Sequence, residues 1–153
     1  MKPRFEISDA GEERTIRVRM IGQFDLRTMN EFAREYRRVS RVYAGTPHMV
    51  LADMRGSQPA SPEVALVLGE TIEFSRQNGV VCCAHLSDDT VQRLQAARLA
   101  RQIAISSDIT FDVVSLEEAE RVLAEKRQQL LPGLVGAKPT GGPTPDTKQR
   151  DTL

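Results

Sequence analysis

Several residue types that particular functions require are scarce in this sequence. None of its 153 residues is tryptophan and only 5% are aromatic, which disfavours a stacking platform for bases or sugars. Lysine plus arginine equals aspartate plus glutamate, at 21 each, so no net charge attracts the chain to nucleic acid or to a membrane surface. No apolar run approaches the roughly 20 residues that cross a bilayer, and the first residues lack the pattern of a signal peptide. We therefore expect a cytoplasmic protein that neither spans a membrane nor binds nucleic acid.

Residues that carry common catalytic or metal-binding chemistry are also few. The only cysteines, Cys82 and Cys83, are adjacent in an apolar run. A bond between strand neighbours would need strained geometry, so we expect two buried thiols. The two histidines lack the Cys/His spacing of a zinc site. The chain has no Gly-x-Ser-x-Gly nucleophile elbow, and no glycine-rich phosphate loop follows a predicted strand. We expect neither a metal site nor a cofactor.

Hydrophobic patterning predicts an α/β domain, a single-layer mixed sheet of about five strands packed with about four helices. Two N-terminal segments alternate between apolar and polar residues and are joined by a turn, so they should pair antiparallel toward one edge of the sheet. Later segments are almost entirely apolar, as in strands that are covered on both faces. The expected strands are Arg4–Ser8, Thr15–Met20, Met49–Ala52, Val80–Leu86 and Ile109–Val114.

Helix signals separate these strands. Asp25 can cap a first helix over Asp25–Tyr43, and Ser61 can cap a second that runs to Gln77. Ser115 and Glu118 form a capping box for the last helix. A third helix is expected after Ser87-Asp88-Asp89, and its apolar positions suggest either self-association as a homodimer or ordinary core packing. Those apolar positions are Leu94, Leu99 and Ile103.

The composition changes beyond Leu131. Proline and glycine recur there without hydrophobic periodicity, so the segment cannot bury enough apolar surface to offset the entropy cost of ordering. We expect one domain over residues 1–131 and a disordered tail over residues 132–153.

Three short motifs occur in a set order along the domain. Gly22-Gln23-Phe24-Asp25 precedes the first helix, Val50–Gly56 ends a central strand in an aspartate and a small turn, and Phe111–Ala119 joins the last strand to its helix. Together they resemble the signatures of STAS domains, the sulfate-transporter and anti-sigma-factor-antagonist family, over about residues 4–125. The resemblance implies a STAS fold and a role as a cytoplasmic binding module.

The loop after Asp53 departs from this family. In the antagonists, a partner kinase phosphorylates a serine at the start of the second helix, and counting from Asp53 puts Pro62 at that position and Val64 at the glycine that follows. Arg55-Gly56 after the strand and the long first helix resemble more the bacterial STAS/SEC14-like branch, which as a rule lacks this serine, and the phosphoswitch branch stays open as the alternative. The resemblance to the STAS/SEC14-like branch implies binding of a partner or a small apolar ligand. Ser61 is left as a phosphorylation candidate, although an ordinary helix cap is the simpler interpretation, and Ser57 is a lesser one.

Two hypotheses on function follow. The first is a non-catalytic regulatory module that binds a protein, such as a kinase, an anti-sigma-like factor or a sensor, or a small apolar ligand. Its binding candidates are Asp53, Arg55, Ser57 and Ser61. The alternative is a small hydrolase-like enzyme, which would need Asp53 and His85 to converge at the strand ends. The first is preferred because the loop contains caps and turns but no nucleophile–base pair.

Overall fold

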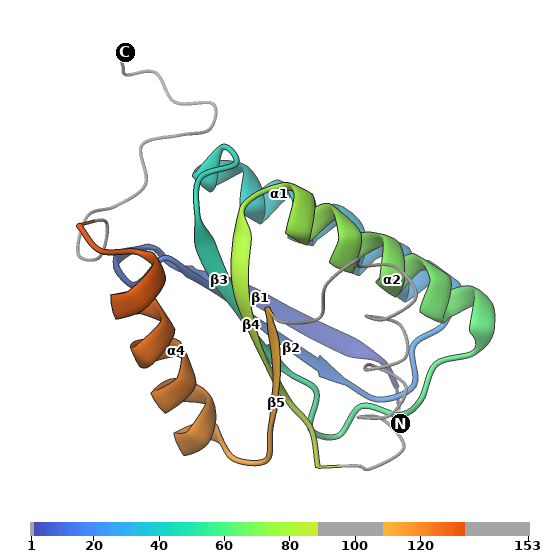
Figure 1. Cartoon of the computed structure of the whole chain (residues 1–153). Coiled ribbons are helices and arrows are strands. Elements are labelled where there is room, and N and C mark those ends of the chain that lie inside the picture. The colour runs from blue at the N-terminus through green and yellow to red at the C-terminus, as the bar shows by residue number, and fades with distance from the viewer. Residues whose placement is uncertain (1, 89–108, 134–153) are drawn as a thin grey trace.

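A five-stranded sheet forms the centre of the computed structural model, which describes residues 2–88 and 109–133 (Figure 1). The strands are β1 Arg4–Ala10, β2 Thr15–Ile21, β3 His48–Asp53, β4 Val80–Leu86 and β5 Thr110–Val113. The helices are α1 Leu26–Ser40, α2 Pro62–Gln77 and α4 Leu116–Leu130, with short 3-10 turns at Gly11–Glu13 and Arg41–Tyr43.

The sheet is mixed, as the patterning predicted. Its strand order is β1-β2-β3-β4-β5, with β1 antiparallel to β2 and all other neighbours parallel. The N-terminal pair thus forms the antiparallel edge that was expected. Because β2, β3 and β4 run in one direction, the loops that follow them leave from the same edge of the sheet.

The pairing between β3 and β4 contains a shift of one residue. It lies between His48 and Met49, near the start of both strands. Beyond the shift, His85 is paired with Ala52 and not with Asp53. Paired residues in a ladder point to the same face and neighbours along a strand to opposite faces. Asp53 and His85 therefore project from opposite faces of the sheet.

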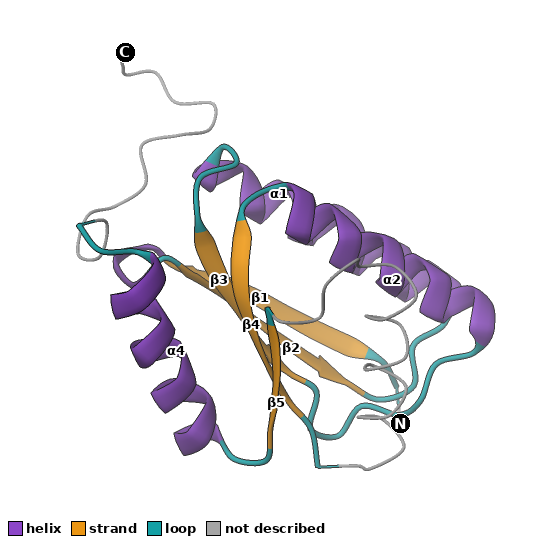
Figure 2. Ribbon diagram, viewed as in Figure 1, coloured by secondary structure: helices purple, strands orange, loops and turns teal. Residues whose placement is uncertain are grey.

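Helices cover both faces of the sheet and enclose two hydrophobic cores. Figure 2 shows α1 and α2 side by side on one face and α4 on the other. The larger core lies under α1 and α2 and includes Ile16, Met20, Phe32, Tyr36 and Val50. The smaller core lies under α4 and includes Met49, Leu51, Cys82, Val113 and Leu123. Coverage on both faces explains why β3 and β4 are nearly all apolar.

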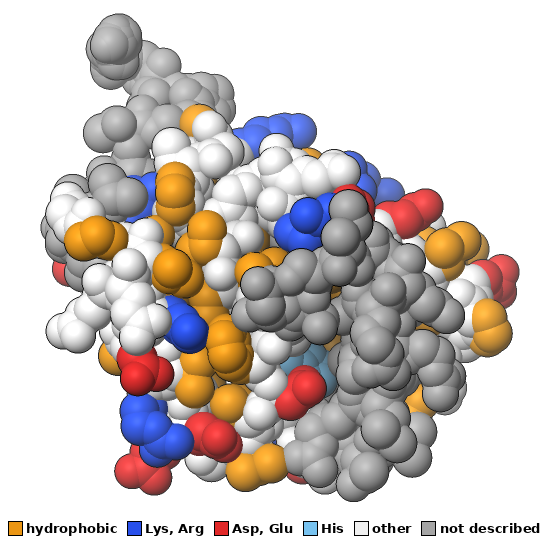
Figure 3. Space-filling model, viewed as in Figure 1, with side chains coloured by type: hydrophobic (Ala, Val, Ile, Leu, Met, Phe, Trp, Pro, Cys, Tyr) orange, Lys and Arg blue, Asp and Glu red, His pale blue; other side chains and the backbone are white. Residues whose placement is uncertain are grey.

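The smaller core reaches the surface along α4. Figure 3 shows hydrophobic side chains gathered along the seam between α4 and the sheet. The Lys126 ammonium lies 4.9 Å from the centroid of the Phe111 ring there, where it covers part of this apolar surface.

Two of the predicted helix caps are confirmed. The Asp25 carboxylate accepts a hydrogen bond of 2.8 Å from the Thr28 N–H, and the Ser115 hydroxyl accepts one of 3.1 Å from the Glu118 N–H. The first helix is shorter than predicted, because α1 ends at Ser40 and a 3-10 turn completes the segment.

Other predictions fall outside the described residues. Three α-helices are described against about four expected, because the third expected helix falls mainly on residues 89–108. The apolar positions behind the suggested homodimer lie in the same stretch. Helix α4 ends at Leu130 and Leu131 is buried, whereas residues 134–153 are not described. The boundary between domain and tail stays a prediction.

Candidate functional site

The loop between β3 and α2 is tied to the loop between β2 and α1. The Gly22 N–H donates to the Gly56 carbonyl at 2.9 Å, and the Gln58 N–H donates to the Gly22 carbonyl at 3.0 Å. Gly56 has a φ of +84°, a left-handed conformation that glycine adopts without strain. These bonds join the two loops into one edge from which α1 and α2 both begin.

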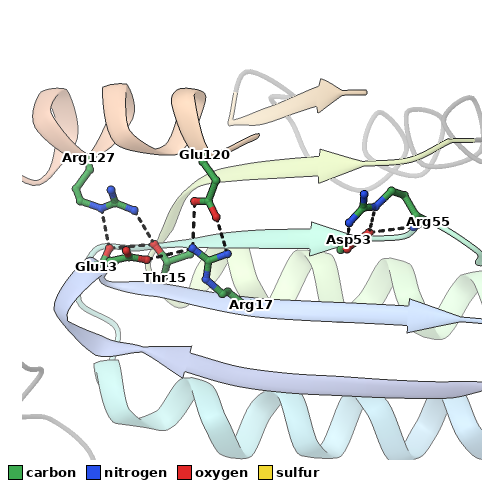
Figure 4. A network of polar contacts seen from close by, with 7 residues as sticks. All are labelled: Glu13, Thr15, Arg17, Asp53, Arg55, Glu120 and Arg127. Carbon is green, nitrogen blue, oxygen red and sulfur yellow. Dashed lines mark hydrogen bonds and ion pairs between the residues drawn. The ribbon is translucent and has the colours of Figure 1, made fainter. Parts of the chain in front are cut away.

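Asp53 opens this loop with a buried carboxylate that is held by Arg55 (Figure 4). Oδ1 accepts from the backbone N–H of Arg55 at 3.1 Å and from its Nε at 3.0 Å, and Oδ2 accepts from Nη2 at 2.8 Å. Burial by itself raises the pKa of Asp53, but the hydrogen bonds from Arg55 outweigh it and the pKa is lowered. Asp53 is therefore an ionised structural group, because its oxygens are already engaged.

A second polar network fastens α4 to the opposite end of the same sheet face (Figure 4). The Arg17 guanidinium lies 3.2 Å from the Glu13 carboxylate and 2.9 Å from that of Glu120. Arg127 donates to the Glu13 carbonyl at 2.9 Å and to the Thr15 hydroxyl at 3.3 Å. Every charged member has a partner, which indicates a structural role.

His85 does not converge with Asp53. It lies on the α1–α2 side of the sheet, with its Nδ1 3.2 Å from Asp112 Oδ1, whereas Asp53 projects from the α4 side. The strands of these two residues are neighbours, but the shared site that the hydrolase alternative requires is absent. The one-residue shift in the β3–β4 pairing is the physical reason.

The two candidate serines differ in accessibility. Ser57 is buried, and its N–H donates to the Met54 carbonyl at 3.0 Å. Ser61 is exposed and occupies the expected N-cap position of α2. Its side chain, however, makes no capping hydrogen bond. Pro62, in the first turn, brings no N–H that would need a partner, and the Glu63 carboxylate complements the positive end of the helix.

Comparison with known proteins identifies the fold. No protein-family model matches the sequence, and no curated protein matches it. Among solved structures, an uncharacterised protein of the DUF3478 family with a SpoIIAA-like fold, from Shewanella loihica PV-4, superposes with a TM-score of 0.62 at 10% identity. The alignment covers 80% of this chain and 96% of that one. The fold is STAS-like. An anti-sigma factor antagonist from Mycobacterium paratuberculosis superposes with a TM-score of 0.53 at 14% identity, over 80% of this chain and 95% of that one.

The STAS-like domain contains a cavity that the sequence analysis missed. It has a volume of about 120 Å³ and lies between α1, α2 and the sheet. Its walls are mainly apolar, but the Tyr36 and His85 side chains also line it. No periodicity signal reveals such a space, because the lining residues belong to ordinary core stripes and the gap arises from how the elements meet.

The described part of the STAS-like domain offers little catalytic chemistry. Burial raises the pKa of the Cys82 thiol to about 11 and that of the Cys83 thiol to about 12, so neither is a thiolate nucleophile near neutral pH. Both thiols are unbonded, and the expected burial is confirmed for Cys82, whereas Cys83 is only half-buried. No three metal-ligating side chains cluster among these residues, and none of the helices in this part has the length and apolar character to cross a membrane.

Proposed function

We propose that the protein is a non-catalytic, cytoplasmic regulatory module that binds a partner protein through the loop edge shared by α1 and α2. The mycobacterial structure of similar fold is described as an anti-sigma factor antagonist, a regulator of another protein. The observation that carries the proposal is the loop edge itself, a rigid surface that presents both apolar and polar side chains.

The exposed side chains at this edge have the composition of a protein interface. Leu26, in the first turn of α1, is 41% exposed, and Leu66, in the second turn of α2, is 60% exposed. The half-buried Arg55 and the exposed Ser61 and Glu63 provide polar groups on the same loop and helix start. Exposed large apolar side chains with polar neighbours are typical of protein–protein interfaces. Because hydrogen bonds already join the two loops, little ordering entropy is lost when a partner binds.

The same geometry argues against chemistry at this edge. Asp53 is neutralised by Arg55 at 2.8 Å, and His85 lies on the other face of the sheet. A hydrolase requires a nucleophile, a base and a group that orients the base within hydrogen-bond distance of one another. Binding without catalysis is the function that these residues support.

Pro62 removes the phosphorylation site that the family has at the start of the second helix. It stands where the family's phosphorylated serine is expected and has no hydroxyl, so a kinase cannot act at that position. The exposed Ser61 hydroxyl is the remaining candidate at this helix start, where a phosphate would gain from the helix dipole and free N–H groups. We propose that the partner, a kinase-like, anti-sigma-like or sensor protein, is bound without the family's switch.

Affinity capture with matched surface variants tests the proposal. Wild-type protein, Leu66→Glu and Leu130→Glu would be used to capture partners from lysates of the source cells, with retained proteins quantified by mass spectrometry. Leu130 is 45% exposed at the end of α4, away from the loop edge, and provides the control. We expect Leu66→Glu to reduce recovery of a specific partner about tenfold and Leu130→Glu to leave it unchanged. Equal recovery with all three proteins, or loss with Leu130→Glu alone, would contradict the proposal.

A further inference from the structure

The cavity under α1 and α2 has the size of a small organic molecule. Its volume is about 120 Å³, and an apolar cavity of about 150 Å³ in another protein binds benzene. Apolar side chains from both helices and from β2, β3 and β4 form most of its wall. These include Met20, Phe32, Met54 and Leu68.

Two residues of the cavity wall carry buried polar atoms that have no hydrogen-bond partner. They are Tyr36 and His85, which are 2% and 7% exposed. The unpaired atoms are the Tyr36 hydroxyl oxygen and both ring nitrogens of His85, although Nδ1 lies 3.2 Å from Asp112 Oδ1. The Ser75 hydroxyl lies near the Tyr36 hydroxyl and donates its own proton to the Thr71 carbonyl at 2.9 Å. Nearly all buried polar groups in proteins are paired, and an unpaired one costs free energy. Unpaired polar atoms on two residues of one cavity indicate that the cavity receives a molecule with a polar group.

The surrounding charges limit what that molecule can be. The Arg76 guanidinium, in the cavity wall, is paired with Glu73 at 2.8 Å, and His85 faces Asp112 at 3.2 Å. No uncompensated charge among the described wall residues would therefore stabilise a charged ligand, and burying an unpaired charge is strongly unfavourable. A hydroxyl group suits both residues, because it can accept from the Tyr36 O–H and can also donate a hydrogen bond.

We propose that this cavity binds an uncharged, phenol-sized molecule whose ring lies among the apolar side chains and whose hydroxyl group hydrogen-bonds to Tyr36 and His85. Water alone is a poorer occupant. A buried water needs two to four polar partners, and the mainly apolar wall offers too few of them to fill the volume with water. The proposal is independent of the protein-binding edge, which lies outside the cavity.

Titration with phenol and benzene, followed by NMR of the methionine methyl groups, tests this inference. We expect phenol to shift the Met20 and Met54 methyl signals, with intermolecular contacts from the ring to both. Tyr36→Phe removes only the hydroxyl and should weaken phenol binding about threefold to tenfold, while benzene binding stays unchanged. Ala52→Leu adds three carbons at the cavity wall and should abolish both.

The possible results separate the inference from its alternatives. If millimolar phenol leaves both methyl signals unshifted, the cavity holds water only or is filled by the chain, and the proposal is overturned. Equal phenol affinity in wild type and Tyr36→Phe would overturn the role of the hydroxyl. If Ala52→Leu does not fold, the contacts between the phenol ring and the methyl groups of the wild-type protein locate the binding site. Contacts to surface methyl groups alone would overturn the proposal that phenol binds in the cavity. Leu66→Glu, which tests the protein-binding edge, should bind phenol like the wild type.

Discussion

Replacement of Arg55 by alanine should expose how strongly the loop edge depends on its buried ion pair. The Arg55 guanidinium supplies two of the three hydrogen bonds to Asp53, at 3.0 and 2.8 Å. The variant retains only the backbone N–H bond of residue 55. A carboxylate with little exposure then loses its counter-charge, with Arg19 on β2 as the remaining positive charge near it.

The expected magnitude follows from the exposure of the two side chains. Removal of one partner from a fully buried pair costs roughly 3–5 kcal/mol, whereas an exposed pair contributes about 0–1 kcal/mol. The Asp53 side chain is 10% exposed but that of Arg55 is 39% exposed, so solvent screens the interaction substantially. We therefore expect Arg55→Ala to lower the free energy of unfolding by about 1–2 kcal/mol at pH 7.

The pH dependence of the unfolding free energy tests whether the loss of the Asp53–Arg55 ion pair causes this destabilisation. The pKa of Asp53 in the folded state is lowered from 3.8, so the stabilisation is present above pH 3.8 and is lost as the pH falls through the folded-state value. The difference between wild type and Arg55→Ala should shrink over that acidic range, because a protonated carboxyl needs no counter-charge.

Urea unfolding followed by circular dichroism at pH 7 and at acidic pH would measure both effects. Asp53→Asn and the double variant complete a cycle that isolates the coupling energy, and Arg55→Lys retains the charge without the paired donors. A cost below about 0.3 kcal/mol at pH 7, or a cost that does not change with pH, would refute the reasoning.

Three other predictions concern His48, Gly79 and Cys83. His48 is fully buried, and burial lowers its pKa below 6.5, so unfolding free energy should fall as the pH drops below 6.5, and His48→Phe should flatten that part of a pH series of urea unfolding. Gly79→Ala should cost about 2–4 kcal/mol, because a Cβ there would lie 2.5 Å from the Thr46 carbonyl at a φ of +105°. Gly45→Ala, at a φ of +80° with nothing within 4 Å, should cost only about 1 kcal/mol in the same assay. The Cys83 thiol, with a pKa of about 12 against an ordinary value of 9.0, should react with a thiol reagent at pH 8 about a thousandfold more slowly than in the unfolded chain, and a native rate within tenfold would contradict the raised pKa.

Local chemistry explains why the element order could be predicted from the sequence. The Asp25 side chain is bonded as a cap to the Thr28 N–H, and the Ser115 side chain is bonded in the same way to the Glu118 N–H. Such caps, like the alternation in β1 and β2, depend on residues a few positions apart. The resemblance to STAS domains was based on the same local motifs, and the fold comparisons confirm it.

The candidate site was only partly predictable. Asp53 was expected at the end of a buried strand, and the structure confirms that place. Its partner could not be assigned, since the aspartate could equally have met backbone N–H groups or a side chain from another strand. The cavity was also beyond prediction, because its volume depends on how α1 and α2 pack against the sheet.

The sequence by itself determined the order of strands and helices and the loop edge at the start of α2, because caps, turns and periodicity act over short distances. Tertiary structure alone decided which side chains share a site. Continuous pairing from His48 with Val80 would have placed Asp53 beside His85, but the one-residue shift at the start of the strands pairs His85 with Ala52. A shift of one residue moves a side chain to the opposite face, so the carboxylate joined an ion pair on one face and the imidazole joined the cavity on the other.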